Sequence, residues 1–129
     1  MTSKKLKSLM ELWMAMNSKI LKNGEINLHF NRIRQLCKKN KVRTLFAFGS
    51  FIQGNYTSES DIDLLVDIDE SDPLSYADYY FDLKFKLELI FNRPVDLLEL
   101  RTLKNPYLKD EIDKTKVLLY GNEDKNLVS

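Results

Sequence analysis

Two aspartates, Asp61 and Asp63, are separated by a single isoleucine and run into an apolar stretch at 64–66. In an extended segment, residues i and i+2 project from the same face and lie about 6.6 Å apart along the strand. Carboxylate oxygens with this spacing suit a hard divalent cation such as Mg²⁺, which also binds the phosphates of a nucleotide triphosphate. The spacing therefore predicts metal-assisted chemistry on a nucleotide. The simpler alternative is a strand edge whose charges face water.

A Gly-Ser pair, Gly49 and Ser50, ends an apolar run and is separated from Asp61 by ten residues. Glycine lets a backbone approach a phosphate closely, because it has no Cβ. A serine hydroxyl and successive backbone N–H groups can then bind the β- and γ-phosphate oxygens. A simple strand-ending turn is the alternative, and the nearby aspartate pair favours phosphate binding.

A third aspartate, Asp96, lies between Val95 and Leu97. An aspartate close to a proline is usually a turn or capping residue. The leucines that follow it instead place Asp96 within a strand.

The composition of the chain limits the class of protein. The chain has 129 residues, of which 43% are hydrophobic and 30% charged, and its formal net charge is +1. These values predict one soluble globular domain, and the small net charge argues against stable nucleic-acid binding. No apolar run reaches the ~18 residues of a membrane span. The single cysteine, Cys37, allows no disulfide framework and fits a reducing cytoplasm.

Hydrophobic periodicity and turn residues predict alternating helices and strands. An amphipathic helix is predicted over 3–21, with Asn23-Gly24 as its stop signal. Further helices are predicted at 28–40, 74–92 and 105–113, and strands at 42–48, 61–68, 95–100 and 116–120. The pattern predicts an α/β or α+β layer structure. We divide the chain into an N-terminal amphipathic helix extension (1–27), a main domain (28–122) and a polar tail (123–129).

These motifs resemble the signature of the DNA polymerase β-like nucleotidyltransferase superfamily. The signature is a Gly-Ser pair, here Gly49-Ser50, followed after ten residues by Asp61-Ile62-Asp63. Residues 93–98 resemble the family strand that carries a third carboxylate, and residues 105–108 and 117–121 are similar to its closing helix and strand. The resemblance covers roughly residues 40–122 and is nearest to the smallest members, the minimal nucleotidyltransferases.

The resemblance implies a small mixed β-sheet with helices packed on one face, in a nucleotidyltransferase domain at 28–122. It implies that Asp61, Asp63 and Asp96 bind two Mg²⁺ ions, and that Asp96 also favours the acceptor alkoxide. Gly49 and Ser50 would hold ATP. Antitoxin members of this group add AMP to a tyrosine of a HEPN ribonuclease toxin. The implied role is therefore a protein adenylyltransferase that forms a homo-oligomer or a hetero-oligomer with such a toxin.

One departure from the family pattern leaves alternatives open. Many minimal nucleotidyltransferases carry an arginine soon after the Gly-Ser pair, where this chain has Phe51, Ile52 and Gln53. Arg43 or a lysine is expected to supply the missing charge.

Asp67 and Asp69 are interpreted as loop carboxylates beyond the metal site. The alternatives are a nucleotidyltransferase for a small molecule such as an aminoglycoside, a non-catalytic antitoxin that masks its partner sterically, and a subunit that recruits nucleic acid.

Overall fold

The computed structural model describes residues 24–54, 57 and 59–121. The predicted helix at 3–21 and the tail at 123–129 lie outside these residues, so the division into an extension, a domain and a tail remains a prediction. The described elements, in chain order, are α3 (Gly24–Lys39), β1 (Val42–Phe48), α4 (Ser50–Gln53), β2 (Ile62–Ile68), α5 (Pro73–Phe91), β3 (Val95–Glu99), the 3₁₀ turn η2 (Leu100–Thr102), α6 (Pro106–Thr115) and β4 (Val117–Gly121).

The strands form one mixed sheet in the order β3-β2-β1-β4. Strand β1 pairs antiparallel with both β2 and β4. Strands β2 and β3 pair in parallel, with α5 as the connection between them. A parallel pair needs such a crossover, because the chain must return to the same end of the sheet. The mixed sheet with packed helices confirms the predicted fold class.

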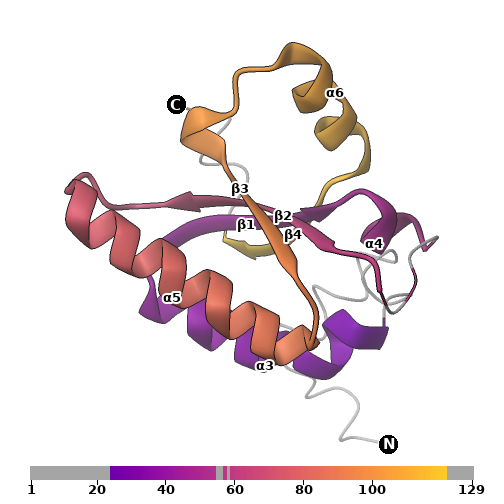
Figure 1. The fold of residues 1–129 in the computed structure, drawn as a ribbon, viewed down its shortest axis with the longest axis horizontal. Coiled ribbons are helices and arrows are strands. Elements are labelled where there is room, and N and C mark those ends of the chain that lie inside the picture. Colours follow the sequence, from indigo (N-terminus) through magenta and orange to yellow (C-terminus); the bar gives the residue numbers. More distant parts are fainter. Residues whose placement is uncertain (1–23, 55–56, 58, 122–129) are drawn as a thin grey trace, which may run out of the picture.

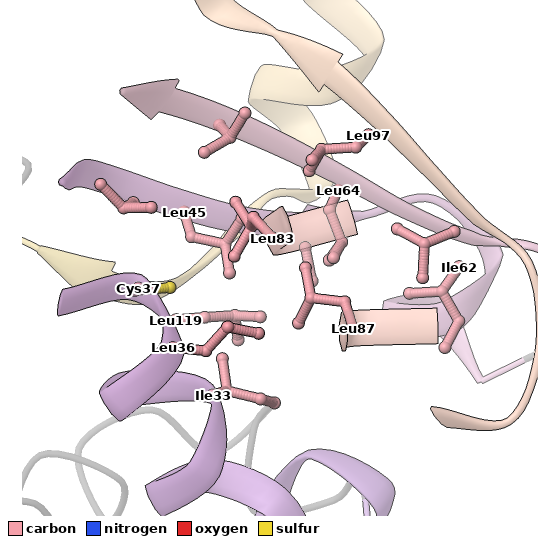
Figure 2. Packing of buried hydrophobic residues seen from close by; sticks show 14 of the residues in the cluster. Ile33, Leu36, Cys37, Leu45, Ile62, Leu64, Leu83, Leu87, Leu97 and Leu119 are labelled. Atoms are coloured by element: carbon pink, nitrogen blue, oxygen red, sulfur yellow. The ribbon is translucent and has the colours of Figure 1, made fainter. Parts of the chain in front are cut away.

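The main core lies between the sheet and the helices α3 and α5 (Figures 1 and 2). Alternate strand residues point into it, such as Leu45 from β1, Leu64 from β2 and Leu97 from β3. The strand residues between them project from the opposite face, which carries both Asp63 and a smaller apolar cluster. Helix α5 begins at Pro73 after Asp72, whose carboxylate accepts a hydrogen bond from the Ser75 N–H at 3.0 Å. This is a standard helix N-cap.

Helix α6 lies on the other side of the sheet from α3 and α5 (Figure 1). Its buried Ile112 packs in a small second cluster with Phe46, Phe48 and Leu65. The expectation that the helices pack on one face therefore holds for α3 and α5, whereas α6 covers part of the opposite face. The reason is that side chains alternate along β1, so its aromatic residues also expose apolar surface on that second face.

Strand boundaries agree with the prediction to within one residue for β1, β2, β3 and β4. The N-terminal boundary of the second predicted helix is wrong, because α3 begins at Gly24 rather than at Leu28. Ile26 is fully buried in the core, so this first turn is held by packing that outweighs the poor helix propensity of Gly24. Among the described residues, no helix is long and apolar enough to cross a membrane.

Candidate active site

Gly49 forms the turn that follows β1 and has a backbone conformation that other residues rarely adopt, with φ 72° and ψ −151°. Its carbonyl accepts hydrogen bonds from the N–H groups of Ile52 and Gln53, at 3.1 and 3.0 Å, which starts α4. A Cβ at this position would lie 2.8 Å from the Asp63 Oδ2. The absence of a side chain at Gly49 is therefore what allows the Asp63 carboxylate to lie against the turn.

Strand register brings the second and third predicted aspartates together. Asp63 pairs with Phe48 across the antiparallel β1–β2 ladder and with Asp96 across the parallel β2–β3 ladder. Neighbouring strands lie about 4.8 Å apart, so the two aspartates are side-by-side neighbours on adjacent strands. Both alternate with residues of the main core and project from the opposite face. Asp61 lies one residue before β2 and is exposed.

The surroundings of Asp63 disfavour its charged form. Partial burial raises the pKa of Asp63, and the negative charges of Asp96 and then Asp61 raise it further. Like charges disfavour ionisation when they share a site, so the two neighbouring aspartates add to the effect of burial on the pKa of Asp63. A bound cation at this position would remove the repulsion.

The oxygen donors fit Mg²⁺. This ion prefers oxygen ligands and typically takes only one or two carboxylates, with waters and substrate phosphates completing its shell. Across residues 24–54, 57 and 59–121, no three acidic, histidine or cysteine side chains are already gathered closely enough to hold a metal ion by themselves. A Mg²⁺ site at Asp61, Asp63 and Asp96 would therefore depend on substrate oxygens or on adjustment of these side chains.

Ser50 is the first residue of α4 and is half-buried beside the Gly49 turn. The short helix is anchored by Phe51, which is 1% exposed and contacts Phe91 edge-to-face with ring centroids 5.5 Å apart. The predicted phosphate-binding pair thus occupies a fixed turn next to Asp63. The structure brings Gly49, Ser50, Asp63 and Asp96 to one end of the sheet.

Arg43 does not supply positive charge to this turn. Its guanidinium binds Asp67 at 3.0 Å and Asp69 at 2.7 Å. Arg43 lies near the start of β1, whereas Gly49 follows the last residue of that strand. The suggestion that Arg43 provides the missing charge is therefore wrong, because carboxylates at the far end of the sheet neutralise it.

Asp67 is also corrected from a loop residue to a strand residue, because β2 continues to Ile68. Asp69 follows the strand as expected. Asp67 lies on the same face of β2 as Asp63, and the sequence does not indicate that an arginine from β1 would pair with it.

Thr115 is a contact of the site that sequence reasoning missed. Its hydroxyl Oγ1 accepts a hydrogen bond from the Gly49 N–H at 3.4 Å and lies 3.3 Å from the Glu111 carbonyl, to which it donates. The contact joins the end of α6 to the Gly-Ser turn across 66 residues of chain. No local motif signals it, since it depends on β4 pairing beside β1.

Carboxylates on neighbouring strands, next to a glycine turn that opens a short helix, are an arrangement compatible with transfer of a phosphate-bearing group. The comparison with known families agrees with this chemistry. The chain belongs to the family described as "Polymerase beta, Nucleotidyltransferase", whose model matches residues 31–125. This confirms the superfamily predicted from the sequence.

Individual relatives show which members of this family the chain is similar to. The chain is 38% identical over 76 residues to "Putative protein adenylyltransferase MJ1379" of Methanocaldococcus jannaschii, covering 59% of this chain and 75% of that protein. A solved structure described as "Crystal structure of the toxin-antitoxin with AMP-PNP" matches with a TM-score of 0.60 and 26% identity, covering 77% of this chain and 78% of the other.

A third match is to a complex of a tri-AMPylated HEPN toxin with an MNT antitoxin, from Shewanella oneidensis. Its TM-score is 0.56 at 25% identity, over 79% of this chain and 77% of the matched chain. The resemblance to minimal nucleotidyltransferases is therefore confirmed.

Proposed function

We propose that this protein transfers AMP from ATP to a tyrosine hydroxyl of a HEPN ribonuclease toxin and acts as its antitoxin. The relative from Methanocaldococcus jannaschii carries the name of a protein adenylyltransferase, and a matched complex holds an AMPylated HEPN toxin. Family membership supports nucleotidyl transfer. The protein would work in the cytoplasm, where ATP is abundant and the lone buried Cys37 stays reduced.

One structural observation carries the proposal: the parallel register that sets Asp63 beside Asp96, with Gly49 against the Asp63 carboxylate. In this proposal Gly49 and Ser50 bind the triphosphate. Asp61, Asp63 and Asp96 would hold two Mg²⁺ ions. When bound, these ions would neutralise the charge that develops on the phosphate oxygens and on the leaving group.

The chain's own residues would do the remaining work. The acceptor oxygen attacks the α-phosphorus, the bond to the β-phosphate oxygen breaks, and pyrophosphate leaves. Asp96 is exposed at the edge of the site, where it can favour loss of the hydroxyl proton. Positioning by a rigid turn and two adjacent strands would supply much of the rate enhancement.

The test is the intact mass of the cognate toxin after incubation with this protein, ATP and Mg²⁺. We expect a gain of one or more AMP units with the wild type and none with the Asp61→Ala, Asp63→Ala double variant. Asp67→Asn is a matched control, since Asp67 lies on the same strand and face but near its far end. We expect this control to modify the toxin normally, and chelation of Mg²⁺ to abolish modification by both the wild type and the control.

Other results would assign other functions. A stable complex without a mass gain would favour steric masking of the toxin. Neither complex nor mass gain, with turnover on an aminoglycoside, would favour a small-molecule acceptor. Retained toxin neutralisation in the double variant would refute AMP transfer as the basis of the biological role.

A further inference from the structure

Within the part of the chain that the structure describes, the Gly-Ser turn of the proposed site carries no positive side chain for the phosphates, while carboxylates lie beside it. Asp63 and Asp96 are neighbours there and Asp61 lies just before β2, whereas the residues after Ser50 in α4 (Phe51, Ile52 and Gln53) carry no charge. Arg43 is paired at the other end of β1. A bound triphosphate would add further negative charge, and phosphate sites commonly use a lysine or arginine to balance it.

Lys116 lies where such a charge is needed. It directly precedes β4, which pairs antiparallel with β1 through Val117 opposite Ala47 and Leu118 opposite Phe46. Continuing this ladder by one residue sets Lys116 beside Phe48, the last residue before Gly49. Phe48 pairs on its other side with Asp63. Lys116 and Asp63 therefore flank the end of β1.

The side chain of Lys116 lies on the same face of the sheet as the carboxylates. Its ammonium is 4.7 Å from the centre of the Phe46 ring. Phe46 belongs to the small cluster on the face opposite the main core, and so does Leu118, two residues after Lys116. Because alternate strand residues share a face, Lys116 also projects toward the face of Asp63.

The backbone before Lys116 is tied to the Gly-Ser turn. The Thr115 hydroxyl accepts the hydrogen bond from the Gly49 N–H, at 3.4 Å. The residue adjacent to Lys116 thus touches the residue adjacent to Ser50. Together with the pairing of β4 and β1, this contact keeps the lysine close to the turn.

The Lys116 ammonium forms an ion pair with Asp113, and a phosphate group can take the place of that carboxylate. Lys116 Nζ lies 3.1 Å from Asp113 Oδ1, whose carboxylate is half exposed, while the lysine side chain is 25% exposed. A partly exposed ion pair contributes little stability. A triphosphate carries more negative charge than one carboxylate, and the four-carbon stem of lysine is flexible.

We infer that Lys116 binds the β- and γ-phosphates of ATP, taking the place of the arginine that α4 lacks. The inference rests on the proposed ATP-dependent function. Lys116 would leave Asp113 for the phosphates when the nucleotide binds, and it would favour a triphosphate over AMP. A purely structural alternative exists, in which Lys116 only covers the Phe46 ring and caps the end of α6.

The test measures binding of a non-hydrolysable ATP analogue and of AMP, both with Mg²⁺, by calorimetry. Lys116→Met keeps an apolar stem over Phe46 and removes the charge. Charge-assisted hydrogen bonds are stronger than neutral ones, so we expect this variant to bind the analogue about tenfold or more weakly. AMP affinity should stay near that of the wild type. Lys116→Arg should retain most of the affinity for the analogue.

Lys114→Met is the matched control, because Lys114 is two residues away and forms a similar ion pair with Asp110 at 3.0 Å. It should bind both nucleotides normally. Thermal melts of all variants would verify folding. Equal affinities of the Lys116→Met and Lys114→Met variants for the analogue would overturn the inference. So would a parallel loss of analogue and AMP binding in Lys116→Met.

The outcome for Lys116 is separable from that for the proposed function. A wild type that binds the analogue but never modifies the toxin would refute protein AMPylation and leave the lysine assignment to stand on the binding data. A wild type that binds no nucleotide would overturn both.

Discussion

Replacing Gly49 by alanine tests whether the absence of a side chain in the Gly-Ser turn sets the position of the Asp63 carboxylate. With φ 72° and ψ −151°, the position lies in a region that is essentially restricted to glycine. Forcing another residue into such a conformation costs about 1–3 kcal/mol. The new Cβ would also lie 2.8 Å from Asp63 Oδ2, whereas ordinary contacts begin at 3.4 Å, so the carboxylate must move by at least the difference, 0.6 Å.

Gly54→Ala is the matched control for Gly49→Ala. Gly54 also has a positive φ, 85°, but a Cβ there would meet nothing within 4 Å. Its expected cost is about 1 kcal/mol, from backbone strain less the gain from a stiffer unfolded chain. For Gly49→Ala we expect about 2 kcal/mol or more. In urea this would lower the unfolding midpoint by about 1 M.

The activity of the two variants should differ more than their stability. Displacement of a catalytic group by about 1 Å can cost about 10²-fold in rate. Gly49→Ala should therefore lose AMP transfer to the toxin to about this extent, measured as the initial rate of mass gain, whereas Gly54→Ala should retain it. Adding Asp63→Ala to Gly49→Ala should recover about 1 kcal/mol of stability, because the contact is removed. Equal unfolding midpoints and equal rates for the two alanine variants would refute the reasoning.

Four further predictions follow from single contacts. Asp63→Asn should raise the melting temperature at neutral pH without Mg²⁺, because the raised pKa of Asp63 means that folding disfavours its charge. This gain should shrink as the pH falls through that pKa toward the unfolded value, and added Mg²⁺ should stabilise the wild type more than the variant. Arg43→Leu should lower stability by at most about 1 kcal/mol and leave ATP binding unchanged, since its carboxylate partners lie away from the turn; weakened ATP binding would contradict its exclusion from the site. Asp72→Ala should lower the melting temperature at neutral pH, because a backbone N–H bond to its carboxylate keeps the pKa of Asp72 below its usual value and caps α5; that stabilisation is lost as the pH falls through the lowered pKa, so the two melting curves should converge in acid. Thr115→Val should cost about 1 kcal/mol in urea unfolding and slow AMP transfer, because the Gly49 N–H loses its acceptor; an unchanged rate would show that this contact does not position the turn.

The sequence predicted the strands because they depend on local pattern. The apolar run at 42–48 became β1 with the same boundaries. Asp63 and Asp96 could be paired only through the family resemblance, since nothing local sets a parallel register between segments separated by α5. The structure confirms that they are adjacent. Their role as metal ligands remains a prediction.

Features that depend on contacts between distant strands could not be predicted. Arg43 pairs with Asp67 and Asp69 only because β1 and β2 are antiparallel neighbours. Helix α6 crosses to the second face because Ile112 finds apolar partners there. The start of α3 was misplaced since Asn-Gly usually stops a helix, whereas burial of Ile26 extends this one toward its N-terminus.

The strand order β3-β2-β1-β4 has a consequence for the order of synthesis. Strand β1, which carries the turn of the site, is among the first described elements made, yet one of its two neighbours is the last. Until residues 117–121 have left the ribosome, the nascent chain exposes the edge of an apolar strand. Such edges template pairing with other chains. Chains truncated before Val117 should therefore aggregate rather than persist as soluble fragments. Strand β1, and the Gly-Ser turn that follows it, acquire their second neighbouring strand only when β4 has been synthesised.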